Sequence, residues 1–181
     1  MFSRVLQRLS AAVLAISVTA CASWGVRLQP GVSTLSDVVG LLGQPAMVWQ
    51  DPDGRQQLAY PLGPEGTETF MVFVGADGLL QTMEKVLDTE HFARIESGRS
   101  TQADVLRLLG PSLPSGTAYF KWRDELVWEW RYCDAWGQRA FFDVLFDAST
   151  GIVRTTYSRP DLTRPRGLAM PCSAWLLPLQ R

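Results

Sequence analysis

Two stretches of the chain share one pattern of polar and apolar positions, 67 residues apart. Residues 31–43 and 98–110 both read Gly-x-Ser-Thr-x-x-Asp-Val-x-x-Leu-Leu-Gly and are identical at eight of thirteen positions. Apolar residues at i, i+3 and i+4 predict one buried face of a short helix in each copy. The predicted stripes are Val38, Leu41 and Leu42 in the first copy and Val105, Leu108 and Leu109 in the second.

Both predicted helices carry start and stop signals. Thr34 and Thr101 are suited to cap the first turn, and Asp37 or Asp104 three residues later completes a capping box. A glycine follows each last apolar residue, and we expect it in a left-handed conformation. The repeat is therefore explained by helix boundaries, and it indicates a duplication, not a site.

Strand patterns follow each helix. Residues 70–82 resemble residues 143–155, and both predict a strand, a tight turn and a strand. Two more strands are predicted upstream in each copy, at 46–49 and 58–60 and at 118–122 and 126–132. A short amphipathic segment, 89–95, precedes the second helix and is suited to form a helix hairpin with it.

We therefore predict an α+β fold of two tandem units, each a short helix or helix hairpin packed on a three- to four-stranded antiparallel sheet. The first unit covers residues 31–88 and the second residues 89–158. Residues 159–181 form a Pro-rich C-terminal tail, which we expect to be an extended wrap.

The N-terminus has the layout of a bacterial export signal. Arg4 and Arg8 precede an uncharged apolar stretch, 9–20, that is too short to span a bilayer. Val-Thr-Ala-Cys at 18–21 resembles the lipobox of bacterial lipoproteins. That resemblance implies a signal peptide at 1–20, cleavage before Cys21 and acylation of its sulfur, with 21–30 as the lipidated N-terminus and linker. An ordinary secretory signal with a chance cysteine, or a buried apolar helix, is the alternative.

Lipidation would place the protein in the envelope. No Asp follows Cys21, and in lipoproteins of the enterobacterial type this resembles the default signal for the outer membrane. We expect a periplasm-facing body held by acyl chains such as palmitate, with inner-membrane retention as the alternative. In an oxidising periplasm Cys133 and Cys172 are candidates for one disulfide, and two separate buried thiols are the alternative.

The composition argues against nucleic-acid binding, metal binding and catalysis. With 17 Lys and Arg against 18 Asp and Glu the net charge is −1, so we expect no nucleic-acid partner. One histidine and three widely spaced cysteines give no metal-ligand pattern, and we expect no metal and no cofactor. His91 lies in a polar stretch and is expected on a solvated face, not as a general base. No nucleophile elbow or phosphate loop is present, so we predict no enzyme activity.

Aromatic side chains supply the candidate contact residues. Alternation along 126–132 places Trp128 and Trp130 on one face of a strand, either as core against the helices or as a protein-binding hot spot. If that face is core, the other carries Glu129 and Arg131, with Phe141, Asp143 and Leu145 on a neighbouring strand. Trp122 and Trp136 lie beside turns, and we expect them to be partly exposed and to be the better partner-binding candidates.

The repeated motif, closed by Gln44-Pro45 in the first copy, and the strand pair around Phe146-Asp147 and Gly151-Ile152 resemble the BamE/SmpA/OmlA-like outer-membrane lipoproteins. The resemblance covers most of residues 30–158 as two copies, a tandem arrangement similar to that of β-lactamase inhibitory protein. It implies a non-catalytic scaffold or accessory factor in envelope assembly or integrity, with an envelope or barrel-assembly protein as partner. The alternative is a periplasmic enzyme-inhibitor-like or ligand-binding module with a concave two-sheet face.

Overall fold

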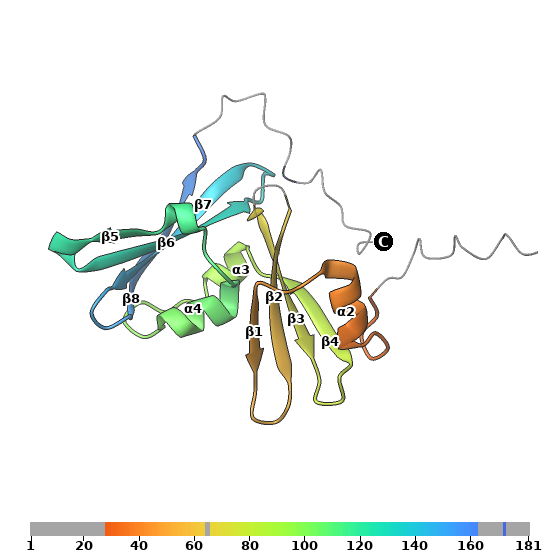
Figure 1. Ribbon diagram of the computed structural model, residues 1–181. Helices are drawn as coiled ribbons and strands as arrows, with labels where there is room; N and C mark the ends of the chain where they lie inside the picture. Colours follow the sequence, from red (N-terminus) through yellow and green to blue (C-terminus); the bar gives the residue numbers. More distant parts are fainter. Residues whose placement is uncertain (1–27, 64–65, 163–171, 173–181) are drawn as a thin grey trace, which may run out of the picture.

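The computed structural model describes residues 28–63, 66–162 and 172 of the chain (Figure 1). The expected signal peptide, Cys21 and most of the Pro-rich tail lie outside the described residues. The first unit contains α2 (Leu35–Leu42), β1 (Met47–Gln50), β2 (Gln56–Leu62), β3 (Glu68–Val74) and β4 (Leu80–Lys85). The second contains α3 (Thr89–Phe92), α4 (Gln102–Leu109), β5 (Ala118–Phe120), β6 (Glu125–Cys133), β7 (Arg139–Asp147) and β8 (Val153–Pro160).

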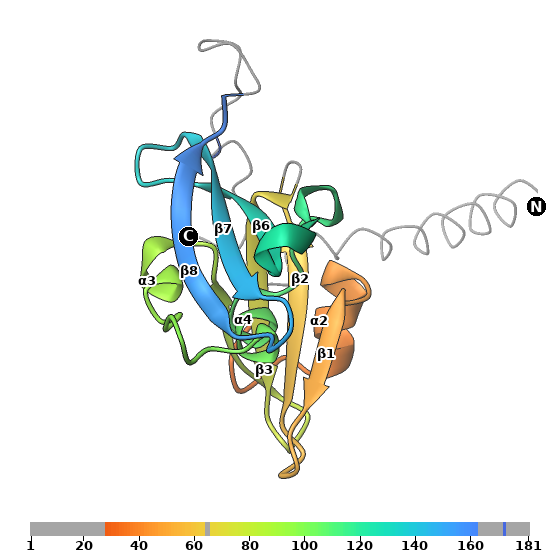
Figure 2. The same ribbon diagram turned by 90° about the vertical axis from the view of Figure 1, so that its left-hand side faces the viewer.

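The strands form two four-stranded antiparallel sheets in sequence order, β1-β2-β3-β4 (sheet 1) and β5-β6-β7-β8 (sheet 2). Figures 1 and 2 show β6, β7 and β8 side by side. The α+β class with two antiparallel sheets agrees with the sequence prediction. Several strand boundaries differ from those expected, and two of them affect the surface described below. Strand β5 ends at Phe120, because Lys121–Arg123 form a 3₁₀ turn, and β8 continues to Pro160, two residues beyond the expected end of its unit.

The duplication extends to individual hydrogen bonds. The Gly31 amide donates to the Leu80 carbonyl at 2.7 Å. The Gly98 amide donates to the Val153 carbonyl at the same distance. The segment that leads into each helix is thereby fixed to the first residue of the fourth strand of its unit. The accompanying β-bridges are Thr34 with Leu79 and Thr101 with Ile152.

Both predicted capping boxes are present. In α2 the Thr34 hydroxyl accepts from the Asp37 amide, and the Asp37 carboxylate accepts from the Thr34 amide at 2.8 Å; α4 repeats this with Thr101 and Asp104. The closing glycines have the expected positive φ, but their ψ angles lie outside the αL range. Gly43 has φ 81° and ψ −163°, and Gly110 has φ 77° and ψ −168°. This region is essentially restricted to glycine, so the residue type is still required.

The predicted stripe holds in α4 but only partly in α2. Val105 and Leu109 are fully buried, as is Val38. Leu41 is 46% exposed, so its place in the stripe was wrong. The α2 side chains near the sheet 1 cluster are Leu35, Val38 and Leu42, which follow one another at i, i+3 and i+7. Leu41 lies outside this line and faces away.

Each sheet has one face in an apolar cluster. The sheet 1 cluster joins Val38 to strand residues Leu58, Tyr60, Val72, Val74 and Leu80. The sheet 2 cluster is larger and joins Val105 and Leu109 to strand residues that include Trp130, Phe142, Val144, Phe146 and Val153. From α3, Phe92 stacks on Phe142 with ring centroids 3.7 Å apart. We call these two faces the inner faces and the opposite ones the outer faces.

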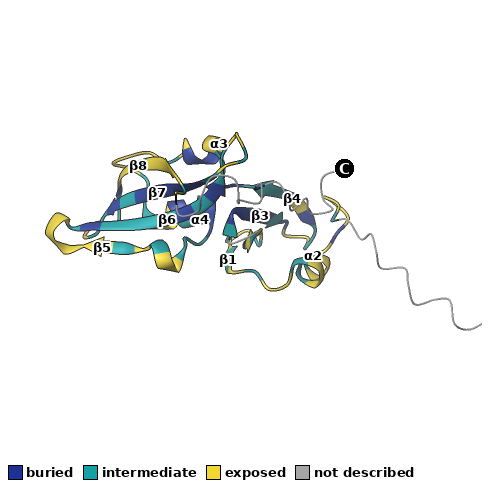
Figure 3. Cartoon of the chain, turned by 90° about the horizontal axis from the view of Figure 1, so that it is seen from above, coloured by how far each residue is buried: buried dark blue, intermediate teal, exposed yellow. Residues whose placement is uncertain are grey.

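Helix α4 also contacts the outer face of sheet 1. Arg107 Nε donates to Gln57 Oε1 at 3.0 Å, its terminal nitrogen pairs with Asp51, and the Gln57 amide donates back to the Arg107 carbonyl. A Cβ on Gly110 would lie 2.9 Å from Thr69 Cγ2. Figure 3 shows α4 at the junction of the two sheets. The inner face of sheet 2 and the outer face of sheet 1 therefore meet around this one helix.

None of the described helices has the length and apolar character needed to cross a membrane.

Candidate functional site

The outer face of sheet 2 holds a groove of about 490 Å³. Its lining comes from β5 to β8 and from the two short 3₁₀ turns beside β5. The cross-strand pairs place an apolar row, Ala118, Val127 and Leu145, beside an acidic pair, Glu129 and Asp143. We call this hollow the sheet 2 groove.

Asp143 is the most deeply placed charge in the groove. It is only 2% exposed, and its carboxylate accepts from Arg159 Nε at 2.7 Å. The Arg159 guanidinium also pairs with Glu129 and lies over the Phe141 ring, 4.4 Å from its centroid. One arginine from β8 is therefore shared between two carboxylates, from β6 and β7. A buried charge requires such pairing to be tolerated.

A second ion pair stands at the other end of the groove. Arg123 Nη2 lies 2.8 Å from Glu125 Oε1, and Glu125 is 9% exposed. The Arg123 guanidinium lies over the Phe120 ring, 4.5 Å from its centroid. Phe120 and Tyr157 are both exposed and add aromatic walls to the lining. The groove thus has charged ends, an apolar floor and aromatic sides.

The surroundings shift the pKa of three groove residues upward. Burial raises the pKa of Glu129, and the negative charge of Asp143 adds to this against the opposing effect of Arg159. Burial and the nearby Asp143 also raise the pKa of Tyr157. For Arg159, burial acts to lower the pKa, but the hydrogen bond and charge of Asp143 outweigh it. The groove therefore disfavours added negative charge and keeps Arg159 protonated.

The backbone beside Glu129 is closely packed. Gly116 precedes β5, and a Cβ at this position would lie 2.6 Å from the Cβ of Glu129. The Leu113 amide donates to the Glu129 carbonyl at 2.8 Å. The turn before β5 is thereby held against β6, and the glycine leaves room for the glutamate side chain.

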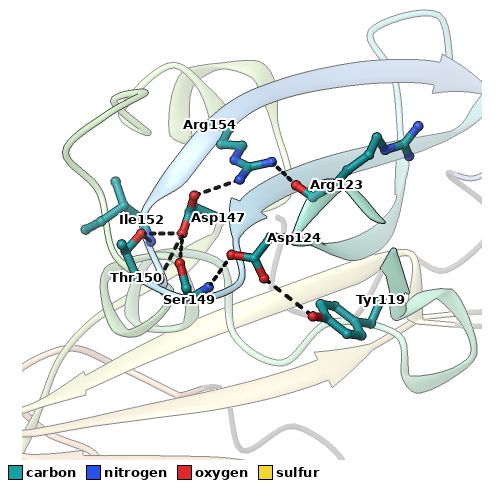
Figure 4. Close-up of polar contacts among 8 residues, drawn as sticks. All are labelled: Tyr119, Arg123, Asp124, Asp147, Ser149, Thr150, Ile152 and Arg154. Carbon is teal, nitrogen blue, oxygen red and sulfur yellow. Dashed lines mark hydrogen bonds and ion pairs between the residues drawn. The ribbon is translucent and has the colours of Figure 1, made fainter. Parts of the chain in front are cut away.

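A polar network fixes the tip of the β5–β6 hairpin to the β7–β8 turn (Figure 4). Arg154 donates to the Arg123 carbonyl and to Asp147 Oδ2, both at 2.7 Å. Asp147 also accepts from Ser149 and Thr150, and these hydrogen bonds with Arg154 lower its pKa well below the usual range. The network positions the turn that carries Arg123.

Asp124 closes this turn and is the only described non-glycine residue with positive φ, at 46°. Asp and Asn adopt this conformation more readily than other side-chain-bearing residues. Its carboxylate accepts from the Ser149 amide at 3.2 Å and from the Tyr119 hydroxyl at 3.4 Å (Figure 4). Contacts from β5 and from the β7–β8 turn therefore hold the tip of the β5–β6 hairpin in place.

Trp122 and Trp136 are both exposed, at 100% and 87%. They do not form one patch, because Trp122 lies in the turn before β6 and Trp136 in the turn after it. Nine strand residues, or about 30 Å, separate these turns. Trp122 stands in the turn between the groove residues Phe120 and Arg123, and Figure 3 shows exposed residues at the tip of β5.

The other two candidate tryptophans lie on the inner face. Trp130 is 2% exposed, and its indole nitrogen donates to the Gly110 carbonyl. Trp128 is partly buried, packs against the same cluster and meets Phe146 edge to face. Of the two interpretations left open by the sequence, these positions favour core over contact surface. The opposite face carries Glu129, Arg131, Phe141, Asp143 and Leu145, the set expected for that case.

Cys133 at the end of β6 and Cys172 lie at disulfide-bonding distance, with their Cα atoms 5.7 Å apart. This separation is within the range that a disulfide requires. Cys21 lies outside the described residues.

His91 is not on a solvated face, and that expectation was wrong. It is 7% exposed, and its Nδ1 lies 2.8 Å from Asp88 Oδ1. The reason is that Asp88 caps α3 and turns the histidine toward β4, where Nε2 lies 3.7 Å from Glu84 Oε2. Within residues 28–63, 66–162 and 172, no three metal-ligating side chains come together.

Sequence reasoning missed Arg159 and Tyr157 as groove residues. Both lie on β8, and the sequence pattern places Arg159 in the tail because the pattern ends at Ser158. Alternation from Thr155 would have placed Tyr157 and Arg159 on the face of Asp143, had β8 been extended by two residues. Gly116 was also missed, and no local signal marks it.

Comparison with known proteins gives no family. No protein-family model matches the chain, and no curated protein matches it. A crystal structure of a DUF4309 family protein, YjgB, from Bacillus subtilis subsp. subtilis str. 168 is similar over 74% of this chain and 82% of its own, with 15% sequence identity and a TM-score of 0.28. No fold or function follows from a TM-score this low.

Proposed function

We propose that the protein is a lipid-anchored outer-membrane lipoprotein that faces the periplasm and acts through protein contact. In this proposal it is a non-catalytic scaffold or accessory factor in envelope assembly or integrity. Cys21 and the preceding export signal support the anchor. The observation that carries the contact function is the sheet 2 groove, with exposed Trp122 and Phe120 at its end.

The composition of this surface supports a protein partner. Binding hot spots are enriched in tryptophan, tyrosine and arginine. The groove lining includes Tyr157 and Arg123, and Trp122 is exposed beside Arg123 in the same turn. The polar network of Asp124 and Asp147 holds that turn. A surface held rigid before binding loses less conformational freedom when the partner docks.

We further propose that each unit is a helix packed across the inner face of its sheet, and that the chain is related to the BamE/SmpA/OmlA-like lipoproteins. The membership of Val38 and of Val105 in the two apolar clusters supports this packing. The repeated capping boxes and strand pairs support the relationship, since they cover both units.

Cross-linked copurification from outer membranes tests this proposal. Tagged protein and a Cys21→Ala variant are compared after gentle solubilisation, with mass spectrometry of the recovered proteins and a palmitate label on both. We expect the label and an envelope or barrel-assembly component with the anchored form alone. A palmitate label that persists in Cys21→Ala would contradict the anchor. Recovery of one soluble periplasmic protein with both forms would instead favour an enzyme-inhibitor-like module.

A further inference from the structure

The two sheets can be matched position by position on their outer faces. Both have a register shift at the same place, between Phe73 and Val74 in β3 and between Leu145 and Phe146 in β7. Phe73 therefore corresponds to Leu145. Strand pairing then extends the match: Gln57 to Val127, Ala59 to Glu129, Met71 to Asp143, and Trp49 to Ala118.

At the matched positions the side chains differ in size and charge. Sheet 1 has Trp49 where sheet 2 has Ala118, and the smaller residue opens a hollow. Sheet 1 has apolar Ala59 and Met71 where sheet 2 has Glu129 and Asp143. The acidic pair of the sheet 2 groove is thus the counterpart of an apolar pair in the first unit, while apolar Val127 is the counterpart of polar Gln57.

In the first unit that surface is occupied. Helix α4 contacts it through Gly110, which approaches Ala59 and Met71, and through Arg107, whose guanidinium is bound by Gln57 and Asp51. The outer face of sheet 1 therefore binds a helix of the same chain. That helix presents a basic side chain, Arg107, to the sheet.

The charges of the sheet 2 groove suit the same kind of occupant. Three carboxylates, Glu125, Glu129 and Asp143, face two guanidiniums, Arg123 and Arg159. Arg123 pairs with Glu125, and Arg159 is shared by the remaining two acids. Arg131, the next outer-face residue on β6, lies over Phe141 and pairs with Asp161. The residues that line the groove therefore carry one more negative charge than positive charges.

We propose that the sheet 2 groove binds a helical segment of a partner protein that presents a lysine or arginine side chain. The basic group lies at the acidic pair, two residues along β6 from Val127, which is the counterpart of the Gln57 that binds Arg107 in sheet 1. The aliphatic part of that side chain lies on Ala118, Val127 and Leu145, and its cationic end lies beside Glu129 and Asp143. The exposed rings of Phe120 and Tyr157 flank it. This inference rests on the proposed contact function and names the chemistry of the partner.

The probes are two alanine-rich helical peptides that differ only at one central residue, arginine or its neutral isostere citrulline. Each is titrated into the full mature protein in detergent micelles, and binding is followed by the NMR methyl signals of Val127 and Leu145. A charge-assisted hydrogen bond contributes about 1.5–3 kcal/mol, so we expect the arginine peptide to bind at least about tenfold more tightly. The Glu129→Gln variant should remove that preference.

An Ala118→Trp variant tests the location without changing charge. It restores the residue that sheet 1 carries at the matched position, and we expect it to abolish binding of the arginine peptide. Val48→Trp is the control for a tryptophan added outside the groove, because Val48 is 54% exposed and pairs with Leu58 on the inner face of sheet 1. It should bind the peptide like the unmodified protein. Unchanged circular dichroism and urea unfolding establish that both variants are folded.

Three results would overturn the inference: no binding of either peptide, equal affinity for both, or binding that survives Ala118→Trp. If a membrane-anchored partner is nevertheless recovered by cross-linking, the proposed function stands and only the cationic specificity falls. If the arginine peptide binds in the groove but no protein copurifies with the anchored form, the proposed function falls and the groove chemistry stands.

Discussion

The indole nitrogen of Trp130 donates a hydrogen bond to the carbonyl oxygen of Gly110, at 3.2 Å. Gly110 ends α4 and also lies against the outer face of sheet 1. The buried Trp130 ring of sheet 2 is thereby hydrogen-bonded to the residue that ends α4 and contacts sheet 1. The contact explains why the second unit carries a tryptophan on its inner face, where the matched residue of the first unit is Tyr60.

The closing glycines provide a matched pair for measuring the contact between the units. Gly43 and Gly110 have nearly the same backbone angles, so alanine introduces similar backbone strain, about 1–3 kcal/mol, at both. A Cβ at Gly43 meets nothing within 4 Å, whereas one at Gly110 lies 2.9 Å from Thr69. Urea unfolding should show Gly110→Ala to be less stable than Gly43→Ala by a further ~1–3 kcal/mol. Equal losses would mean that the units are not in close contact here.

The tryptophans should separate into two groups by stability. Trp130→Ala leaves a cavity in the core and removes the Gly110 hydrogen bond, so we expect a loss of about 3–5 kcal/mol in the free energy of unfolding. Trp122→Ala removes a fully exposed side chain and should change it by no more than about 0.5 kcal/mol. A large loss for Trp122→Ala would show that its ring is covered in the folded protein.

The Cys133–Cys172 pair is tested by counting thiols in denatured, unreduced mature protein. We expect neither cysteine to react, and two reactive thiols would refute the bond. The sequence separation of 39 closes a loop for which the chain-entropy estimate is ~4 kcal/mol. The Cys172→Ser variant should lose stability of that order. Reductant should destabilise the unmodified protein and leave the variant unchanged.

Acid should weaken the turn network around Asp147. Its pKa in the folded protein lies below the ordinary value of 3.8, because Arg154, Ser149 and Thr150 bind the carboxylate. Its contribution to stability is therefore present above pH ~4 and is lost as pH falls through the lowered pKa. The Asp147→Asn variant should have a lower Tm at neutral pH, and its Tm should converge with that of the unmodified protein toward pH ~2. A constant difference across this range would assign the effect to packing.

Glu129 should behave in the opposite way. Its raised pKa means that folding disfavours the ionised form, so its unfavourable contribution appears as pH rises from the ordinary value of 4.5 through the folded pKa. At neutral pH the Glu129→Gln variant should be as stable as the unmodified protein or more so, while it loses affinity for the arginine peptide. A marked loss of stability would show that Glu129 is retained for its pairing with Arg159.

Much of the fold could be predicted because its signals are local. The Thr34 and Thr101 capping boxes, the helix spans and the Asp77-Gly78 turn depend on residues close in sequence, and the duplication reinforced each of them. The face of β6 that carries Glu129 followed from alternation alone. The exposure of Trp122 and Trp136 followed from their places beside turns.

The remaining features depend on contacts between distant segments. Gln57 and Arg107 are 50 residues apart, and no local pattern shows that α4 touches sheet 1. His91 becomes buried because β4 lies beside α3. The groove needs Gly116, Ala118 and Arg159, whose roles appear only when four strands are aligned. Size differences between matched positions of a repeat would be the sequence signal to look for in such cases.

Photo-cross-linking in living cells tests the central claim, that the outer face of sheet 2 contacts a protein. The photoreactive residue p-benzoylphenylalanine replaces Tyr157, a wall of the groove, or Val48, a similarly exposed position on the other sheet. The account predicts a discrete cross-linked envelope protein from position 157, lost on addition of Ala118→Trp, and no such product from position 48. No product from position 157, or the same product from both positions, would contradict it.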